Sequence, residues 1–453
     1  MHSNYFHSVK LNKEKCKGCV TCIRFCPTEA IRIRDGKAQI IESRCIDCGE
    51  CIRRCPNHAK HADVDSLSDL KNFPFNVALP APALYAQFSS DVSREKIFAA
   101  LRQLGFDGVY EVSLAAEYIT LEIEDYIKHT AGLPKPMISS ACPAILRLVQ
   151  VRFPDLIKNI IPILPPVELA AAEARREYSR VFGLAPKQIG VWFLTPCPAK
   201  ATNIRQPVDV ISTELDGAIA ISSIYAELTK TLPYISEETV SAKSSSYGIG
   251  WGFAGGEIRA TGIVNSLVVH NIMEVVEVLE QIEMNKLQDV DYVECLACPG
   301  GCIGGPLLPE SHFVAEKNLK LRLRRMRDQE QGDREETILK NKKEVYSASP
   351  FRHRTIHPRP IMKLDNNIIA AMQKVDKIKE ILSGLPGIDC GACGSPSCDS
   401  FAEDVVQGAA NENDCIFKLR QAIDALEEKM NKQAEALTET KNSAAGGEKD
   451  ETQ

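Results

Sequence analysis

Residues 294–305 read ECLACPGGCIGG and place Cys295, Cys298 and Cys302 among four glycines. Because glycine has no Cβ, the backbone at these positions can approach a bound group closely. The stretch overlaps VDYVECL (290–296), an apolar run typical of a buried strand. It therefore predicts a strand that ends in a loop rich in thiols and glycine.

Two further cysteines follow apolar runs in the same way. Cys142 comes after PMISSA (136–141), and Cys197 comes at the end of IGVWFLTP (189–196). Taken singly, each cysteine is more often a small buried hydrophobic residue than a ligand. Taken together, four thiolates from three loops could close on one iron–sulfur cube, and Lys200 would offer an ammonium to an anionic group there.

The region from about 75 to 345 alternates apolar strands with amphipathic helices, which predicts α/β layers with parallel strands. Functional loops then lie at the carboxyl ends of the strands. The other strand candidates are FNVALP (75–80) and GVYEV (108–112), and the clearest helices are REKIFAALRQLG (94–105) and PVELAAAEARREYSRVFG (166–183).

The amino-terminal region contains one cysteine pattern twice, C-x2-C-x2-C-x3-C-P. This is the run of two-cluster ferredoxins, in which the fourth cysteine of each copy serves the other cluster. A zinc module is the weaker alternative. The first predicted [4Fe–4S] cluster takes Cys16, Cys19, Cys22 and Cys55, and the second takes Cys45, Cys48, Cys51 and Cys26.

The carboxyl-terminal region has a third cysteine group, spaced C-x2-C-x4-C-x16-C and formed by Cys390, Cys393, Cys398 and Cys415. It is similar to the single-cluster Fe-S domain of Rnf-type electron-transfer subunits, with zinc as the alternative. Beyond it, apolar residues recur at steps of three and four, as in a short helix that pairs with another helix.

Composition supports metal rather than disulfides. The chain has 453 residues, 17 cysteines and a net charge of −6. Disulfides concentrate in small exported domains, whereas this start lacks an apolar signal core, so we expect a cytoplasmic protein without a membrane span. The charge gives no reason to expect nucleic acid, and the basic stretch KNLKLRLRRMR (317–327) reads as a solvated, salt-bridged helix.

These patterns predict a mixed α/β chain of several parts. They are a two-cluster ferredoxin-like domain (1–66), a cluster domain of two α/β lobes (75–345), a linker (346–372), a small helical single-cluster domain (373–417), a heptad-like helix (418–441) and a disordered tail (442–453).

Residues 1–345 resemble [FeFe]-hydrogenases. The family's three signatures read approximately TSCCP, MPCxxK and ExMxCxxGCxxGG, and they correspond here to SSACP (139–143), TPCPAK (195–200) and the stretch from Glu294 to Gly305. The approach VALPAPALYAQF (77–88) and the glycine-rich GFAGGEI (252–258) add to the resemblance.

The resemblance implies that a [4Fe–4S] cluster is held by Cys142, Cys197, Cys298 and Cys302. Cys302 would also bridge to a two-iron subsite carrying CO, cyanide and a dithiolate. Lys200 would hydrogen-bond one cyanide, and Pro82 and Ala83 would line the other through their backbone. The further residues expected around this cofactor are Ser139, Ser140, Gly301, Gly304 and Gly305.

The departures from the family pattern concern proton transfer. Active members have a proton-passing cysteine just before the first ligand, where this chain has Ala141. Glu122 and Glu124 lie in the region of the family's relay carboxylates, but read better as surface residues of a helix. Cys295 is the one cysteine left over, by default a buried structural thiol and alternatively part of a proton relay. Thr195 and Leu296 replace the usual methionines.

These departures resemble the divergent, sensory [FeFe]-hydrogenases. The sequence therefore predicts a hydrogenase of low turnover, interconverting H2 with protons and electrons and sensing H2 or redox state. A redox protein such as ferredoxin is expected as partner, with a downstream protein or a second copy at the carboxyl-terminal helix. The alternatives are a catalytic ferredoxin-linked hydrogenase, and an electron carrier or assembly factor that lacks the two-iron subsite.

Overall fold

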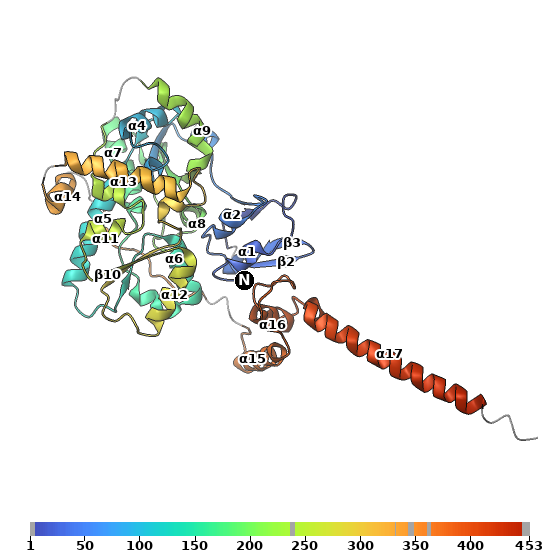
Figure 1. The fold of residues 1–453 in the computed structure, drawn as a ribbon. Coiled ribbons are helices and arrows are strands. Elements are labelled where there is room, and N and C mark those ends of the chain that lie inside the picture. The colour runs from blue at the N-terminus through green and yellow to red at the C-terminus, as the bar shows by residue number, and fades with distance from the viewer. Residues whose placement is uncertain (1–4, 236–240, 331, 343–347, 360–363, 446–453) are drawn as a thin grey trace, which may run out of the picture. The chain divides into compact units, whose positions relative to one another are not determined.

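The computed structural model describes residues 5–235, 241–330, 332–342, 348–359 and 364–445 (Figure 1). By contacts within the chain, these residues form two units. Unit 1 comprises residues 1–16, 25–30 and 40–361, and unit 2 comprises residues 17–24, 31–39 and 362–453. The predicted ferredoxin-like region is therefore divided between the two units. Its segments 17–24 and 31–39 belong to the unit that contains the carboxyl-terminal part of the chain.

Unit 1 contains two parallel sheets, as the strand–helix alternation predicts. The first has the strand order β6-β5-β8-β9, and the second has the order β10-β11-β7. The strands are β5 (Phe75–Pro80), β6 (Gly108–Val109), β7 (Met137–Ile138), β8 (Ile189–Thr195), β9 (Gly217–Ala220), β10 (Ser266–His270) and β11 (Tyr292–Leu296). The two sheets correspond to the two predicted lobes.

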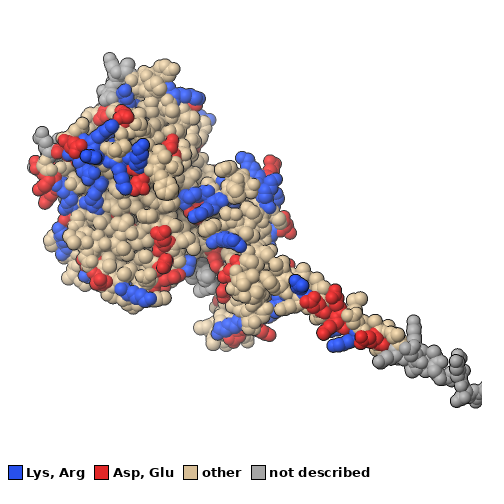
Figure 2. All heavy atoms as spheres, in the orientation of Figure 1, with Lys and Arg blue, Asp and Glu red and all other residues tan. Residues whose placement is uncertain are grey.

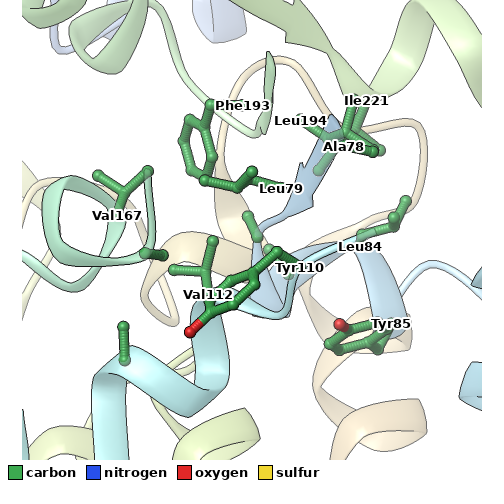
Figure 3. Close-up of a cluster of buried hydrophobic side chains, with 14 of the residues drawn as sticks. Ala78, Leu79, Leu84, Tyr85, Tyr110, Val112, Val167, Phe193, Leu194 and Ile221 are labelled. Carbon is green, nitrogen blue, oxygen red and sulfur yellow. The ribbon is translucent and has the colours of Figure 1, made fainter. Parts of the chain in front are cut away.

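Helices cover the faces of both sheets, so strands β5 and β8 are apolar on both sides, as parallel strands require. Figure 3 shows Leu79 of β5 with Phe193 and Leu194 of β8 in the buried cluster. The indole of Trp192 donates to Asn76 Oδ1 at 2.8 Å, which satisfies two buried polar groups within this core.

The helices of unit 1 follow the strands along the chain. They are α2 (Glu50–Arg54), α3 (Pro82–Tyr85), α4 (Arg94–Gln103), α5 (Val112–His129), α6 (Pro143–Arg152), α7 (Pro166–Phe182), α8 (Pro198–Arg205), α9 (Ile221–Thr231), α10 (Ser246–Gly250), α11 (Gly256–Thr261), α12 (Ile272–Glu283), α13 (His312–Gln329) and α14 (Arg334–Lys342).

The strand predicted over 108–112 is wrong in its second half. β6 ends at Val109 and α5 begins at Val112. The turn between them is fixed by Glu111, whose carboxylate accepts from the backbone N–H of Lys243 at 2.6 Å and of Ser244 at 3.1 Å. A long-range contact of this kind cannot be read from the apolar pattern of GVYEV.

Helix α13 carries the basic stretch at 317–327, and Figure 2 shows its Lys and Arg side chains gathered on one face of the molecule. Lys320 pairs with Glu316 at 2.5 Å, and Arg325 pairs with Asp91 at 2.7 Å. Arg322 instead turns inward and donates to backbone carbonyls. These contacts fit a solvated, salt-bridged helix.

The described part of the amino-terminal region contains four short strands. In unit 1, β1 (Val9–Leu11) pairs with β4 (Lys60–Ala62) in antiparallel fashion. Strands β2 (Ile31–Arg34) and β3 (Lys37–Ile40) form a hairpin. Its turn residues Asp35 and Gly36 have φ values of 52° and 67°, the left-handed conformation that two-residue hairpin turns need and that Asp-Gly favours.

Unit 2 adds four helices, α1 (Thr21–Arg24), α15 (Ile368–Ser383), α16 (Cys398–Val406) and α17 (Ile416–Ala445). α17, the red helix of Figure 1, extends the helix predicted over 418–441 by a few residues at each end. Its apolar residues from Ile416 to Leu437 are exposed. Most of the predicted tail lies outside the described residues, and no helix among those described is long and apolar enough to cross a membrane.

The segment 348–359, for which the sequence predicts a linker, is packed against unit 1. Pro350 O accepts from the Leu164 N–H at 2.7 Å, and the Arg359 N–H donates to Gln150 O at 2.9 Å. Ile356 is buried among residues of the second sheet. We call residues 348–359 the strap.

Candidate metal centres

Four cysteines of unit 1 come from the carboxyl ends of strands in both sheets. Cys142 follows β7 and precedes α6, Cys197 follows β8 and precedes α8, and Cys298 follows β11. Cys302 opens the short 3-10 helix after that loop. Parallel strands present their carboxyl ends at one edge of a sheet, and here the edges of two sheets supply one site.

The electrostatics of these thiols show that they lie together. Burial raises the pKa of Cys302 well above its usual value, and the neighbouring thiols of Cys197, Cys142 and Cys298 raise it further. Burial and the Cys142 thiol likewise raise the pKa of Cys197 to about 11. Four neighbouring thiols, of which Cys298 is buried and the other three are half-buried, fit a metal cluster, whose positive iron would stabilise their thiolates. We call them the four-thiol site.

A cation also lies beside this site. Lys200, on the first turn of α8, lowers the pKa of both Cys302 and Cys197 by its charge, against the larger effect of burial. Its backbone N–H is also bonded to the Cys197 sulfur. The Thr195 hydroxyl donates to Cys197 O at 3.0 Å and accepts from its N–H at 3.2 Å, which holds this loop in place.

The glycines of the third signature allow close approach of backbone to backbone. A Cβ on Gly305 would meet Pro196 of the Cys197 loop, and one on Gly304 would meet the Pro299 carbonyl. Gly301 has a φ of 91°, and a Cβ there would lie 2.6 Å from Ala254 N. Gly305 therefore brings two loops of the four-thiol site together, whereas Gly304 closes its own loop and Gly301 packs against the GFAGGEI segment.

The predicted cyanide-lining residues open α3, directly after β5. Pro82 is half-buried and Ala83 is fully buried. A Cβ on Gly252 would lie 3.3 Å from Pro82 C and 3.4 Å from Ala83 N, so the GFAGGEI segment packs against this turn. Gly252 O in turn accepts from the Ile303 N–H at 2.9 Å, which joins the turn to the four-thiol loop.

Ser139 and Ser140 have partners within the protein. The Ser139 hydroxyl accepts from the Cys295 N–H at 3.0 Å, and the Ser140 hydroxyl donates to Ile163 O at 2.6 Å. Both are buried. These bonds fix the Cys142 loop against β11, and a role of either serine toward a cofactor stays a prediction.

Cys295 and Ala141 lie near the four-thiol site without belonging to its ligand set. Cys295 is fully buried in the apolar cluster of the second sheet, and burial, then the Cys142 thiol, raises its pKa far above the usual value. Both properties fit an inert structural thiol. Glu124 of α5 is one of the two carboxylates upstream of Ala141. It is paired with Lys128 of the same helix at 2.5 Å and with Arg334 of α14 at 2.7 Å.

Sequence reasoning missed two buried carboxylates on the other side of β11. Glu294 accepts from the backbone N–H groups of Gly255 and Ile258, each at 3.0 Å, and Glu257 accepts from the Tyr292 hydroxyl. Burial, and after it the Glu294 charge, raise the pKa of Glu257 to about 8, and burial raises the pKa of Glu294 to about 7. The sequence signals that could have revealed them are Glu294 inside an apolar strand and Glu257 inside GFAGGEI.

This pair predicts a pH-dependent stability. Both pKa values are raised above 4.5, so the folded chain retains protons that the unfolded chain releases. The stabilisation is complete below about pH 4.5 and is lost as the pH rises through 7 to 8, by about 1.4 kcal/mol per pH unit for each group. Anaerobic thermal unfolding should show a Tm that falls between pH 5 and 8.

Glu257→Gln should flatten this pH dependence, because the amide does not titrate. Glu277→Gln, which changes an exposed glutamate on α12, is the matched control and should leave the slope unchanged. Equal slopes in the two variants would contradict the assignment of the titration to this pair.

The second predicted ferredoxin group lies wholly in unit 1. Burial raises the pKa of Cys45 strongly, and the charges of Cys51 and Cys26 contribute to the rise. Burial and the Cys26 charge raise that of Cys48. These four thiols therefore fit one cluster. The other predicted group has Cys16 and Cys55 in unit 1 and two members in unit 2, so its assembly stays a prediction.

Arg53 of α2 lies between this ferredoxin group and the four-thiol site, a contact that sequence reasoning also missed. Its guanidinium donates to Gly304 O at 2.8 Å and is bonded to the Cys298 sulfur. Burial lowers the pKa of Arg53, but the nearby charges of Cys298, Glu50 and Cys48 raise it more. One cation thus faces thiols of both predicted clusters.

The third group lies in unit 2. Burial raises the pKa of Cys393, and the Cys415 and Cys390 charges raise it further, so these three thiols are close. Cys398 opens α16, and its N–H donates to Asp389 at 2.6 Å. Cys415 directly precedes α17. This arrangement fits the predicted single-cluster module.

Models of known families match three parts of the chain. The iron-only hydrogenase large subunit, C-terminal domain, matches residues 75–262 and 251–306. A 4Fe-4S dicluster domain matches residues 8–56, and a putative Fe-S cluster domain matches residues 385–417.

Individual proteins match as well. The periplasmic [Fe] hydrogenase large subunit of Nitratidesulfovibrio vulgaris is 26% identical over 370 residues, which cover 67% of this chain and 87% of that one. A probable cytosolic Fe-S cluster assembly factor of Caenorhabditis elegans is 26% identical over 302 residues, 55% of this chain and 66% of that one. A solved structure of the [FeFe]-hydrogenase HydA, studied for H-cluster assembly, has a TM-score of 0.52 at 17% identity, covering 65% of this chain and 98% of that one.

Proposed function

This chain belongs to the iron-only hydrogenase large-subunit family, and on that premise we propose that it is an [FeFe]-hydrogenase of low turnover that senses H2 or redox state. The observation that carries the proposal is the four-thiol site beside Lys200, next to a residue 141 that cannot carry a proton. The ligand set is complete, whereas the usual proton donor is replaced by the methyl group of Ala141.

In this proposal Cys142, Cys197, Cys298 and Cys302 hold a [4Fe–4S] cluster, and Cys302 also bridges to the two-iron subsite. When bound, that subsite supplies the chemistry that splits H2 into protons and electrons. Lys200 provides a positive charge for an anionic ligand such as cyanide. Burial of the site excludes water and strengthens this charge interaction.

Electrons would leave the four-thiol site through the ferredoxin group beside it. Arg53 favours extra negative charge on either side, because its guanidinium faces thiols of both. A second contact, within unit 2, supports electron transfer to the third cysteine group. The β2–β3 hairpin packs on the third group, where the Ile33 N–H donates to Gly394 O at 2.7 Å.

Asp404 strengthens this contact within unit 2. Its carboxylate accepts from Arg32 at 2.5 Å, from Arg34 at 2.7 Å and from the Ser395 hydroxyl at 2.7 Å. Asp404 is buried, so the bonds are worth more than exposed ion pairs. We propose that the third cluster exchanges electrons with the amino-terminal ones and passes a redox signal to α17, whose exposed apolar residues suit a second copy or a partner helix.

Two alternatives make different use of the same site. A catalytic ferredoxin-linked hydrogenase would need a proton donor in place of Ala141. An electron carrier or assembly factor would hold only [4Fe–4S] clusters and would leave Lys200 without an anionic ligand. The similarity to an assembly factor of Caenorhabditis elegans supports this alternative. The cytoplasmic location also stays a prediction.

The rate of H2 evolution tests the sensory proposal. With reduced viologen as donor, the anaerobically matured protein should evolve H2 about 10²–10⁴-fold more slowly than a standard [FeFe]-hydrogenase, the usual cost of a missing acid–base group. The standard enzyme, matured and assayed in parallel, is the control for cofactor loading. Equal turnover would contradict the sensory role and favour the catalytic alternative.

A further inference from the structure

A cleft in unit 1 gathers three arginines from two segments of the chain. It lies between α6, which supplies Arg147 and Gln150, and the strap, which supplies Arg354 and Arg359. Tyr5 and the turn after α8 complete its wall. Its volume of about 170 Å³ would hold about six water molecules, at roughly 30 Å³ for each in the liquid, or one small polyatomic anion.

Arg147 is the most unusual of these residues. Its side chain is only 1% exposed, and it is among the largest fully buried side chains of the described chain. Nε is bonded to the Tyr5 hydroxyl at 3.2 Å and Nη2 to Gln206 O at 2.8 Å, but the buried Nη1 has no hydrogen-bond partner. A buried donor on a charged group without a partner is costly, so negative charge brought into the cleft beside it would be favourable.

The other two arginines also have only neutral partners. Arg354 donates to Pro207 O at 2.8 Å, and Arg359 donates to Cys45 O at 3.1 Å and lies over the Tyr5 ring. In the described part of the chain, no carboxylate lines the cleft or pairs with any of the three guanidiniums. Three like charges thus lie around one cleft, so an anion bound there would have a favourable charge interaction with all three.

We propose that this cleft binds a phosphate group, either as inorganic phosphate or as part of a nucleotide. Guanidinium forks match phosphate oxygens in paired hydrogen bonds, and several arginines are typical where phosphate is recognised. A carboxylate has fewer oxygens and a smaller charge than phosphate, so it would match three arginines less well. The site is separate from the four-thiol site and does not depend on the two-iron subsite.

The position of Arg359 links the cleft to a predicted cluster. Its Nη2 donates to the backbone carbonyl of Cys45, a ligand of the second ferredoxin group. Bound phosphate adds negative charge near this group, so it opposes reduction of the cluster. By reciprocity, reduction must weaken phosphate binding by the same factor. The cleft would therefore make electron transfer sensitive to a phosphate-bearing ligand.

Isothermal titration calorimetry tests the phosphate site on the full-length protein. The protein should contain its [4Fe–4S] clusters but not the two-iron subsite. Oxidised protein should bind inorganic phosphate at one site, less tightly at higher ionic strength. Arg354→Gln, which changes an exposed residue, should weaken binding about tenfold or more, the value of a lost charge-assisted hydrogen bond. Arg180→Gln, an exposed arginine of α7 outside the cleft, should leave binding unchanged.

A second titration, with ADP, distinguishes a site for inorganic phosphate from a site for a nucleotide. Tighter binding of ADP than of inorganic phosphate, with the same loss in Arg354→Gln, would identify a nucleotide site, and the reverse order would identify free phosphate. Absence of binding by both, or equal binding in the Arg354 and Arg180 variants, would overturn the proposal. Equal affinity in oxidised and dithionite-reduced protein would overturn the link to the cluster.

Discussion

Replacing Cys298 by alanine should abolish H2 chemistry completely. The side chain is one of four thiols that come together from three loops, and a [4Fe–4S] cluster needs a thiolate at each corner that the protein holds. Burial raises the pKa of Cys298 to about 12, and Arg53 opposes this rise. We expect the variant to lose about four irons per chain, measured by iron analysis, and to show no H2 evolution.

Cys295→Ala is the matched control, because Cys295 lies three positions earlier in the same stretch. Its thiol is fully buried and packs in the apolar cluster, so the change should cost some stability but leave the iron content unchanged. If Cys295→Ala removed iron and Cys298→Ala did not, the assignment of Cys298 as a ligand would be wrong. Loss of H2 evolution with full iron content in Cys295→Ala would instead assign a proton-relay role to this thiol.

Replacing Ala141 by cysteine should increase turnover. Ala141 directly precedes the ligand Cys142 and is only half-buried, so a thiol can be accommodated there. Restoring a general acid–base group typically raises a rate by about 10²–10⁴-fold. H2 evolution by matured protein with reduced viologen is the measurement.

Ala141→Ser controls for the change of size in this second experiment. The serine hydroxyl has the same branching as the cysteine thiol and is somewhat smaller, but its pKa is much higher, so it should give little of the gain. Equal rates for alanine, serine and cysteine at this position would show that proton supply does not limit turnover. The low-turnover proposal would then need another cause.

Much of the fold could be predicted from the sequence because the two longest strands of unit 1, β5 and β8, are almost entirely apolar. FNVALP and IGVWFLTP became β5 and β8 almost residue for residue, and their carboxyl ends carry the site, as parallel strands require. The shorter β9 and β10 were missed. GAIA has only four residues and runs directly into the apolar start of α9, and SLVVH is exposed at Val268, so neither gives a clear apolar period.

The cysteines of the candidate site were predicted from their spacing and from the family resemblance. The residues that surround and support these cysteines were not predicted. Arg53 and Glu257 act through contacts between residues far apart in the chain, and no local pattern marks them. The strap shows the same limit. Its proline, serine and histidine content reads as a linker, yet Ile356 and the backbone at Pro350 hold it against unit 1.

Infrared spectroscopy of the matured protein is the most direct measurement of the central claim. A two-iron subsite attached at Cys302 beside Lys200 predicts CO and cyanide bands, and these bands should change when argon is replaced by H2. The Cys298→Ala variant, carried through the same maturation, should show none. Absence of the bands from the unmodified, fully iron-loaded protein would contradict the account and leave an electron carrier or assembly factor as the better description.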